Sequence, residues 1–306
     1  MANNHNEHAH MAKAGSRVLT ISLIITVVIM VVEAIGGLLS NSLGLLGDAG
    51  HMLVDSLSLG LTLIALNIAR RPPTLTRTFG YYRAEIIAAL TNGSILIVLS
   101  LVVFYESYQR FLSPPKINTP LMIGVAAVGL VGNFTSIILI RRTGKMNLNI
   151  KAAFWHILGD TISSLGVIAA GAIILITGWS YADPLIAVII GFIILYGAVQ
   201  LVKESLDVLL EAVPKQIAVE KVIKTLKEIN GVEEVHDIHI WTITSGIYAL
   251  SAHLMVKDVM VSRSAELLEA ANHSLENNYN ITHTTLQLEC ETCTSGNTCG
   301  IMPPQH

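Results

Sequence analysis

The chain has 306 residues, of which 52% are hydrophobic and only 13% are charged, and its formal net charge is −3. A soluble globular domain carries about 25% charged residues, so this composition excludes a purely soluble protein. No basic patch is present, which argues against a nucleic-acid-binding protein. The shortage of charge ends near residue 202, so we expect a membrane domain followed by a small soluble domain.

Six apolar segments are each long enough to form a transmembrane helix, which needs about 20 residues. They are Val18–Leu39, Leu43–Ile68, Ile86–Tyr108, Leu121–Ile140, Ala152–Thr177 and Ala182–Val202. The pattern predicts an α-helical membrane protein with six transmembrane helices over residues 17–206. A flexible, histidine-containing cytosolic leader is expected at residues 1–16.

Lysine and arginine are distributed unequally between the two sides of the predicted membrane domain. One side carries Lys13, Arg17, Arg70, Arg71, Arg77, Arg83, Arg141, Arg142, Lys145, Lys151 and Lys203. The other side carries only Arg110 and Lys116. Because short basic loops stay in the cytoplasm, we expect a multi-pass protein of the inner (cytoplasmic) membrane with both termini in the cytoplasm.

The second and fifth predicted spans share the pattern His-x-x-x-Asp, as His51/Asp55 and His156/Asp160. Residues i and i+4 share one helix face, so two such helices side by side would present two imidazoles and two carboxylates to one point. An aspartate in hydrocarbon costs about 2.5–3.5 kcal/mol on insertion scales, so two copies require a reason. The alternative is a local His–Asp hydrogen bond within each helix.

Other polar residues in the spans are weaker signals. Asp48 lies one turn before His51. It is either a carboxylate that supports the site or lines the access path to it, or a residue of the helix start at the outer interface. The remaining ones either line a water path or bond between helices: Glu33, Asn67, Asn92, Glu106, Asn133 and Asp183.

Two imidazoles and two carboxylates suit Zn²⁺, with Cd²⁺ and Co²⁺ as chemical neighbours. Imidazole must be neutral to bind metal, so protons and metal compete for such a site. This competition is the minimal chemistry of metal/proton exchange. We therefore predict a secondary active transporter that exports Zn²⁺ from the cytosol in exchange for protons by alternating access.

Other function classes fit the sequence less well. An intramembrane zinc hydrolase needs a separate general base, such as the Glu of H-E-x-x-H, and no such motif is present, so no enzyme is expected. A primary pump needs a phosphate-binding loop, which is also missing from the sequence. A divalent-metal channel or uniporter without proton coupling is the alternative, although a four-ligand cage binds more tightly than conduction requires.

Residues 207–290 show the patterns of a small α+β domain. Apolar residues at helical spacing predict helices over 215–230 and 264–279. Runs rich in β-branched residues predict strands over 235–244, 248–256 and 281–289, the first two joined as a hairpin. The order αββαβ indicates a sheet covered by helices on one face.

Together these motifs resemble the cation diffusion facilitator family, and within it the bacterial cobalt–zinc–cadmium resistance branch. The resemblance rests on the two His-x-x-x-Asp pairs, Leu46-Gly-Asp-Ala-Gly-His51, Phe79-Gly-Tyr-Tyr-Arg-Ala-Glu85 and His236-Asp-Ile-His-Ile-Trp241. It implies a homodimeric zinc/proton antiporter whose transport ligands are the two pairs. It also implies a ferredoxin-like cytoplasmic domain for dimerisation and metal sensing. The loop 141–151 contains no histidine, which favours a bacterial exporter.

The resemblance further implies a structural or regulatory zinc site in the cytoplasmic domain. Its candidate ligands are His236, His253, His283 and Glu289, and the resemblance leaves the third position open between His283 and the preceding Thr282. Side chains alternate along a strand, so His236 and His239 should face opposite ways unless a bulge intervenes. The alternative is that these are ordinary strand histidines.

The C-terminal end carries a Cys-x-x-Cys motif, Cys290 and Cys293. Residues 291–306, which include Cys293, are expected to form a flexible cysteine-containing tail. Two thiolates make only half of a zinc site. Some family members that the chain resembles pair such a motif with an N-terminal one, which makes His5, His8 and His10 the candidate partners. The alternative is a leader and a tail that bind metal only loosely.

Overall fold

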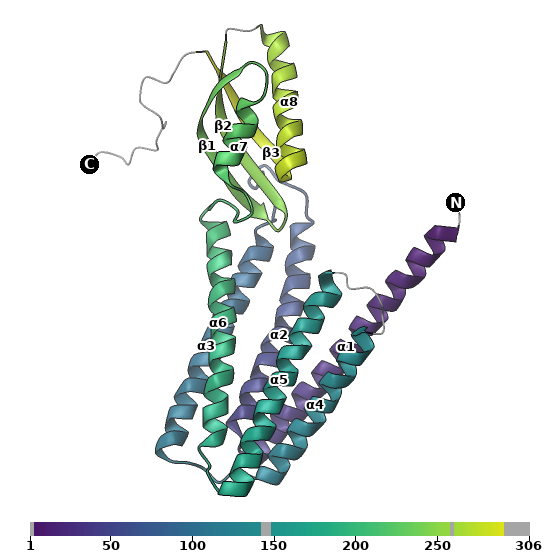
Figure 1. Cartoon of the computed structure of the whole chain (residues 1–306), viewed down its shortest axis with the longest axis vertical. Coiled ribbons are helices and arrows are strands. Elements are labelled where there is room, and N and C mark those ends of the chain that lie inside the picture. The colour runs from purple at the N-terminus through teal and green to yellow at the C-terminus, as the bar shows by residue number, and fades with distance from the viewer. Residues whose placement is uncertain (1–2, 142–147, 258–259, 291–306) are drawn as a thin grey trace, which may run out of the picture. The chain divides into compact units, whose positions relative to one another are not determined.

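A computed structural model describes residues 3–141, 148–257 and 260–290 of the chain (Figure 1). Its elements are α1 Asn3–Ser40, α2 Leu43–Ala69, α3 Ala84–Leu112, α4 Thr119–Arg141, α5 Leu148–Thr177, α6 Ala182–Leu209, α7 Val219–Lys227, β1 Val232–Thr244, β2 Ile247–Val256, α8 Val261–Tyr279 and β3 Ile281–Glu289. Six of the helices, α1 to α6, are long and apolar enough to cross a membrane. This confirms the predicted six-helix membrane protein with a C-terminal αββαβ domain.

The observed helices are longer than the apolar segments that predicted them. The first helix begins at Asn3, inside the segment expected to be a flexible leader, and the sixth continues to Leu209. No proline interrupts either extension. Hydropathy marks the part of a helix that suits hydrocarbon, whereas backbone hydrogen bonding continues until a residue breaks it.

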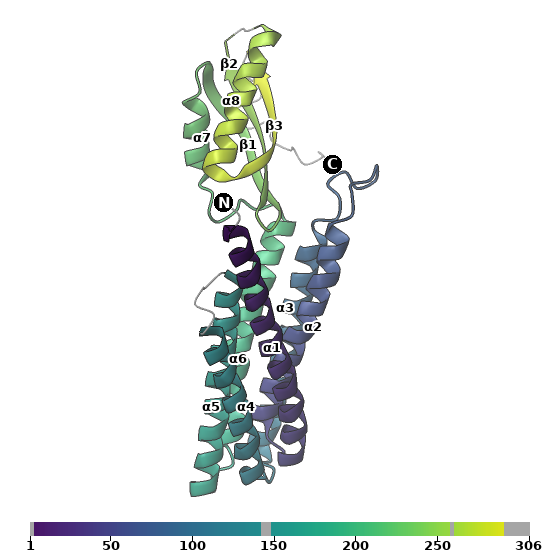
Figure 2. The same cartoon turned by 90° about the vertical axis from the view of Figure 1, so that its right-hand side faces the viewer.

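The chain forms two compact units, residues 1–61 with 91–201 and residues 62–90 with 202–306. In the first unit, α4 packs against both α1 and α5, as the two views show (Figures 1 and 2). Small residues allow this close approach: Gly36 of α1 lies against Val125, and Gly132 of α4 lies against Ile29. Interfaces between transmembrane helices are enriched in such residues because they let backbones come together.

The start of α2 is held by a residue of another helix. Asp183, in the first turn of α6, is fully buried. Its carboxylate accepts hydrogen bonds from the Ser42 hydroxyl at 2.6 Å and from the backbone N–H groups of Leu43 at 2.7 Å and Gly44 at 3.1 Å. Arg110 of α3 also donates to it, at 3.4 Å. The first N–H groups of a helix have no intrahelical partners, so Asp183 caps α2 and ties its start to α6 and α3.

The second unit contains a three-stranded sheet in the order β1-β2-β3. Strands β1 and β2 pair antiparallel, and β2 pairs parallel with β3. Parallel neighbours need a crossover connection, which α8 provides. The helices α7 and α8 bury their apolar faces against the sheet in a core that includes Val222, Leu226, Leu254, Leu275 and Ile281.

Candidate metal centres

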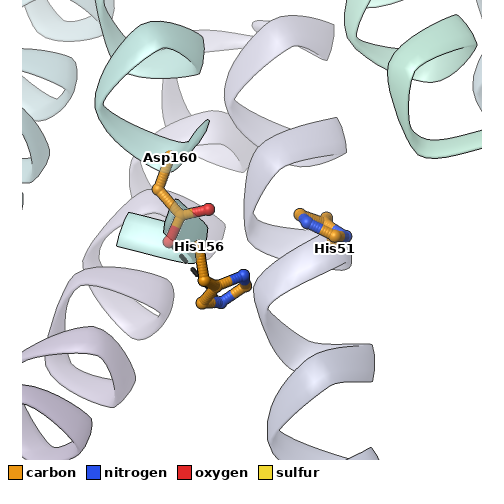
Figure 3. Close-up of side chains that lie close together, drawn as sticks. All are labelled: His51, His156 and Asp160. Atoms are coloured by element: carbon orange, nitrogen blue, oxygen red, sulfur yellow. Dashed lines mark ion pairs between the residues drawn. The ribbon is translucent and has the colours of Figure 1, made fainter. Parts of the chain in front are cut away.

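Helices α2 and α5 bring both His-x-x-x-Asp pairs to one place in the first unit. We call this group the membrane cluster; its members are His51, Asp55, His156 and Asp160. Figure 3 shows three of them, with His156 and Asp160 on one helix and His51 on its neighbour. The helical spacing of each pair places its two side chains on the same face, so that two facing helices suffice to assemble the group.

The distances within the membrane cluster are close to those between ligands of one metal ion. Asp55 Oδ2 lies 3.4 Å from His51 Nε2 and 3.5 Å from His156 Nε2. His156 Nε2 lies 3.7 Å from Asp160 Oδ2. Tetrahedral ligands that are each about 2.0 Å from zinc lie about 3.3 Å from one another. The three separations are only slightly longer than this value, although Asp55 is not among the ligand atoms that all lie within 4.8 Å of one another.

One contact distinguishes a shared site from two local pairs. The carboxylate of Asp55 on α2 approaches the imidazole of His156 on α5 as closely as it approaches His51 on its own helix. In addition, ligand atoms of His51, His156 and Asp160 all lie within 4.8 Å of one another. Two independent hydrogen bonds, each within its own helix, would require neither arrangement.

The membrane cluster has one buried and one accessible side. The side chain of Asp160 is 3% exposed, whereas that of His156 is 38% exposed. The imidazole of His156 thus lies on the accessible side of the cluster, and the carboxylate of Asp160 lies on the buried side. Removal from water strengthens the attraction between the carboxylate and a cation.

Asp48 lies one turn before His51 but is not among the candidate metal-binding atoms. Its side chain is buried, and its Oδ2 atom has no hydrogen-bond partner among the described residues. The helix begins at Leu43, and Asp183 caps that start, so Asp48 has no role in helix capping. Its position inside the helix argues against a role at the helix start. It favours the other alternative, a carboxylate next to the membrane cluster.

A second group of ligand-type side chains lies on the sheet of the second unit. We call it the cytoplasmic cluster; its members are His236, His253 and Glu289. The strand register places His236 opposite His253 and places Met255 beside Glu289. Glu289 Oε2 lies 3.0 Å from His236 Nε2, and its Oε1 lies 3.0 Å from His253 Nδ1. One carboxylate thus spans two imidazoles, a set that a zinc-type ion can use.

A β-bulge adds a second carboxylate at the edge of this cluster. The register of β1 shifts between His236 and His239, and Asp237 has a φ of 47°. Aspartate adopts this left-handed region more readily than most residues. Asp237 Oδ2 lies 3.7 Å from His253 Nε2, and its Oδ1 lies 3.2 Å from the exposed His239. Strand alternation alone did not reveal Asp237, although its place between two histidines was a visible signal.

The structure does not bring His283 into the cytoplasmic cluster. His283 pairs with Ala249 of β2, and its ring packs against that of Phe79 at 5.4 Å between centroids. Glu289 lies six residues further along the same strand, which corresponds to about 20 Å. Because both residues lie on β3, this separation does not depend on the register between strands, and the two side chains cannot bind one ion while the strand is extended.

Comparisons with known families identify the chain. The model of the cation efflux transmembrane domain matches residues 19–210, and that of the cation efflux protein cytoplasmic domain matches residues 214–291. The chain belongs to the cation diffusion facilitator family. Members of this family are cation-efflux transporters, so this protein is a transporter and not an enzyme.

Curated relatives match this cation diffusion facilitator over nearly its whole length. The cadmium, cobalt and zinc/H(+)-K(+) antiporter of Bacillus subtilis (strain 168) is 42% identical over 95% of this chain and 93% of its own length. The metal cation efflux system protein CzcD of Cupriavidus metallidurans is 40% identical over 94% and 90%. The zinc transporter ZitB of Escherichia coli (strain K12) is 35% identical over 96% and 94%.

A solved structure, the metal-bound C-terminal domain of the Cupriavidus CzcD transporter, is also similar. It is 34% identical, covers 24% of this chain and 99% of its own, and aligns with a TM-score of 0.22.

The third predicted site involves the two ends of the transporter. Cys290 is described and exposed, without a disulfide. Cys293 and the side chains of His5, His8 and His10 lie outside what the structure describes. The terminal site therefore stays a prediction.

Replacement of His253 by alanine should weaken metal binding at the cytoplasmic cluster, because its imidazole lies between Glu289 and Asp237. Losing an outer-sphere partner alone costs roughly 10–100-fold in metal affinity, so loss of a ligand should cost at least as much. Zinc titration of the full-length protein by calorimetry measures this change. His239→Ala is the matched control, because His239 is exposed and lies outside the cluster. Equal effects of the two substitutions would contradict the assignment.

Proposed function

We propose that this protein is a secondary active transporter that exports Zn²⁺, together with Cd²⁺ and Co²⁺, from the cytosol in exchange for protons by alternating access. The observation that carries the proposal is the membrane cluster, two imidazoles and two carboxylates at ligand-to-ligand distances between α2 and α5. The names of the relatives agree with it: one is a cadmium, cobalt and zinc antiporter and another is a zinc transporter.

The chemistry of the membrane cluster supports exchange with protons. A histidine binds metal only as neutral imidazole, so an imidazole that takes up a proton releases its metal. Two carboxylates balance the charge of one divalent ion, which lowers the electrostatic cost of holding Zn²⁺ within the membrane domain. A site open to the cytosol would load zinc, and the same site open to a more acidic exterior would load protons.

We further propose a homodimer in the inner membrane, with both termini in the cytoplasm. The second matched family model describes a cytoplasmic domain and is named for dimerisation. The excess of lysine and arginine in the second and fourth loops supports this orientation. In this arrangement, zinc is the transported substrate at the membrane cluster and a regulatory ion at the cytoplasmic cluster.

Zinc uptake into proteoliposomes tests the exchange. With an acidic lumen, purified protein should accumulate zinc against its gradient, and a protonophore should abolish this accumulation. One pH unit is worth about 1.4 kcal/mol per proton, so it supports about a tenfold zinc ratio for each proton exchanged. Zinc that only equilibrates across the membrane, with or without the pH gradient, would favour the channel or uniporter instead.

A further inference from the structure

Glu33 of α1 is a buried carboxyl group that the four proposed metal ligands leave unused. Only 1% of its surface is exposed. Neither of its carboxylate oxygens has a hydrogen-bond partner among the described residues. An ionised carboxylate in such surroundings costs several kcal/mol, whereas a protonated one is neutral. The buried side chain therefore favours the protonated form in this arrangement.

The neighbouring helix provides a niche for this carboxyl group. Glu33 Oε1 lies so close to Gly129 of α4 that a Cβ atom at that position would overlap it. Asn133 follows Gly129 by four residues and therefore lies on the same face of α4, the face toward α1. Asn133 is 1% exposed, and neither atom of its amide has a partner in the described part of the chain. Helices α1 and α4 thus each carry a buried polar side chain without a hydrogen-bond partner among the described residues.

The niche is electrostatically connected to the membrane cluster. Glu33, Asp48 of α2 and Asp160 of α5 are all buried, and each has a carboxylate oxygen with no hydrogen-bond partner among the described residues. Helix α1 also contacts α5, the helix that carries Asp160. The three carboxyl groups come from three different helices, and α4 adds the uncharged amide of Asn133. Ionised carboxylates enclosed together without hydrogen bonds repel one another and lack solvation, so an empty cluster favours a neutral Glu33. A divalent ion beside Asp160 would be the largest local charge and would reverse that preference.

We propose that the Glu33 carboxyl group is a proton-binding site of the exchange cycle, separate from the metal ligands. It is protonated while the membrane cluster is empty and ionised while the cluster holds zinc. When zinc binds, the O–H bond of Glu33 breaks, the electron pair stays on the carboxylate, and the proton leaves to water on the side from which the metal came. This inference rests on the proposed zinc/proton exchange and assigns one of its protons to a residue.

The chemistry of the niche favours a proton over a second metal ion. It offers carboxyl and amide oxygens but no imidazole or thiolate, so it does not suit zinc. Potassium remains a distinct outcome that the experiment must separate from a proton. If potassium neutralises Glu33, changing the potassium concentration at constant pH will alter zinc binding, and the variant Glu33→Gln will lose that dependence.

Proton release on zinc binding tests the proposal. Full-length protein in detergent is titrated with zinc in weakly buffered solution, and the protons released per bound zinc are measured with a pH dye. Glu33→Gln keeps the shape of the side chain but cannot release a proton. It should bind zinc with an affinity within a few-fold of the parent and release fewer protons, by up to about one per zinc. Glu106→Gln is the matched control, because Glu106 is an exposed carboxylate of α3.

Infrared difference spectroscopy provides a second measurement, which detects the proton directly in the unsubstituted protein and uses Glu33→Gln to assign the band. Zinc binding should remove the carbonyl band of a protonated carboxyl group, and this band should be missing from Glu33→Gln. The proposal is overturned if zinc removes no such band, if Glu33→Gln releases as many protons as the parent, or if potassium replaces the proton. These outcomes are separable from failure of the proposed function, which would appear as zinc flux that ignores the pH gradient.

Discussion

Replacement of Asp55 by alanine is expected to abolish proton-coupled zinc transport. Its carboxylate contacts both imidazoles of the membrane cluster, at 3.4 Å and 3.5 Å, so it joins the two helices through one oxygen atom. Its removal takes away one ligand and one of the two negative charges that balance Zn²⁺. Because even outer-sphere partners are worth roughly 10–100-fold in metal affinity, the loss should be at least as large. Zinc uptake into acidic-lumen proteoliposomes measures it.

A carboxylate elsewhere in the membrane domain serves as the control for this substitution. Glu106→Ala removes a negative charge from an exposed position of α3 and should leave uptake near the parent value. Asp55→Asn separates the effect of charge from that of shape. The amide oxygen can still bind the metal ion, but the uncharged side chain does not balance the positive charge of that ion. Full proton-coupled uptake by Asp55→Ala would exclude this residue, and with it the four-ligand site.

The periodicity of the sequence was sufficient to predict most of the architecture. Continuous apolar runs of about 20 residues identify transmembrane helices because the bilayer has a fixed thickness. The repeat of His-x-x-x-Asp on antiparallel spans, such as that of His51 and that of His156, also predicted convergence of two helix faces. The helix ends were less predictable, because α1 and α6 continue beyond the apolar residues.

Residues whose roles depend on a distant partner could not be assigned from the sequence. Glu33 appeared there only as one polar residue among several, and its niche depends on the missing side chain of Gly129 on another helix. His283 is a different case, because the predicted strand over 281–289 already placed it about 20 Å from Glu289, so its exclusion from the cluster could have been predicted. The left-handed backbone conformation of Asp237, by contrast, could not be predicted from the sequence and is visible only in the folded strand.

The capping of α2 by Asp183 leads to a large expected effect on stability. Asp183→Ala removes three hydrogen-bond acceptor contacts from the start of α2 and leaves Arg110, whose side chain is 12% exposed, without its carboxylate partner. Removal of one partner of a buried ion pair costs about 3–5 kcal/mol. We therefore expect Asp183→Ala to lower the thermal unfolding temperature of the detergent-solubilised protein substantially, as measured by circular dichroism.

Smaller substitutions at the same place separate the contributions. Ser42→Ala removes one hydrogen bond to Asp183 and should cost only about 0.5–1.5 kcal/mol. Arg110→Ala combined with Asp183→Ala should be less destabilising than the sum of the two, because the double variant leaves no unpaired buried charge. Unfolding of Asp183→Ala at the parent temperature would show that the cap does not stabilise α2. If the cap does hold α2, it also fixes the depth of His51 and Asp55, which lie two to three turns further along the same helix, relative to the pair on α5.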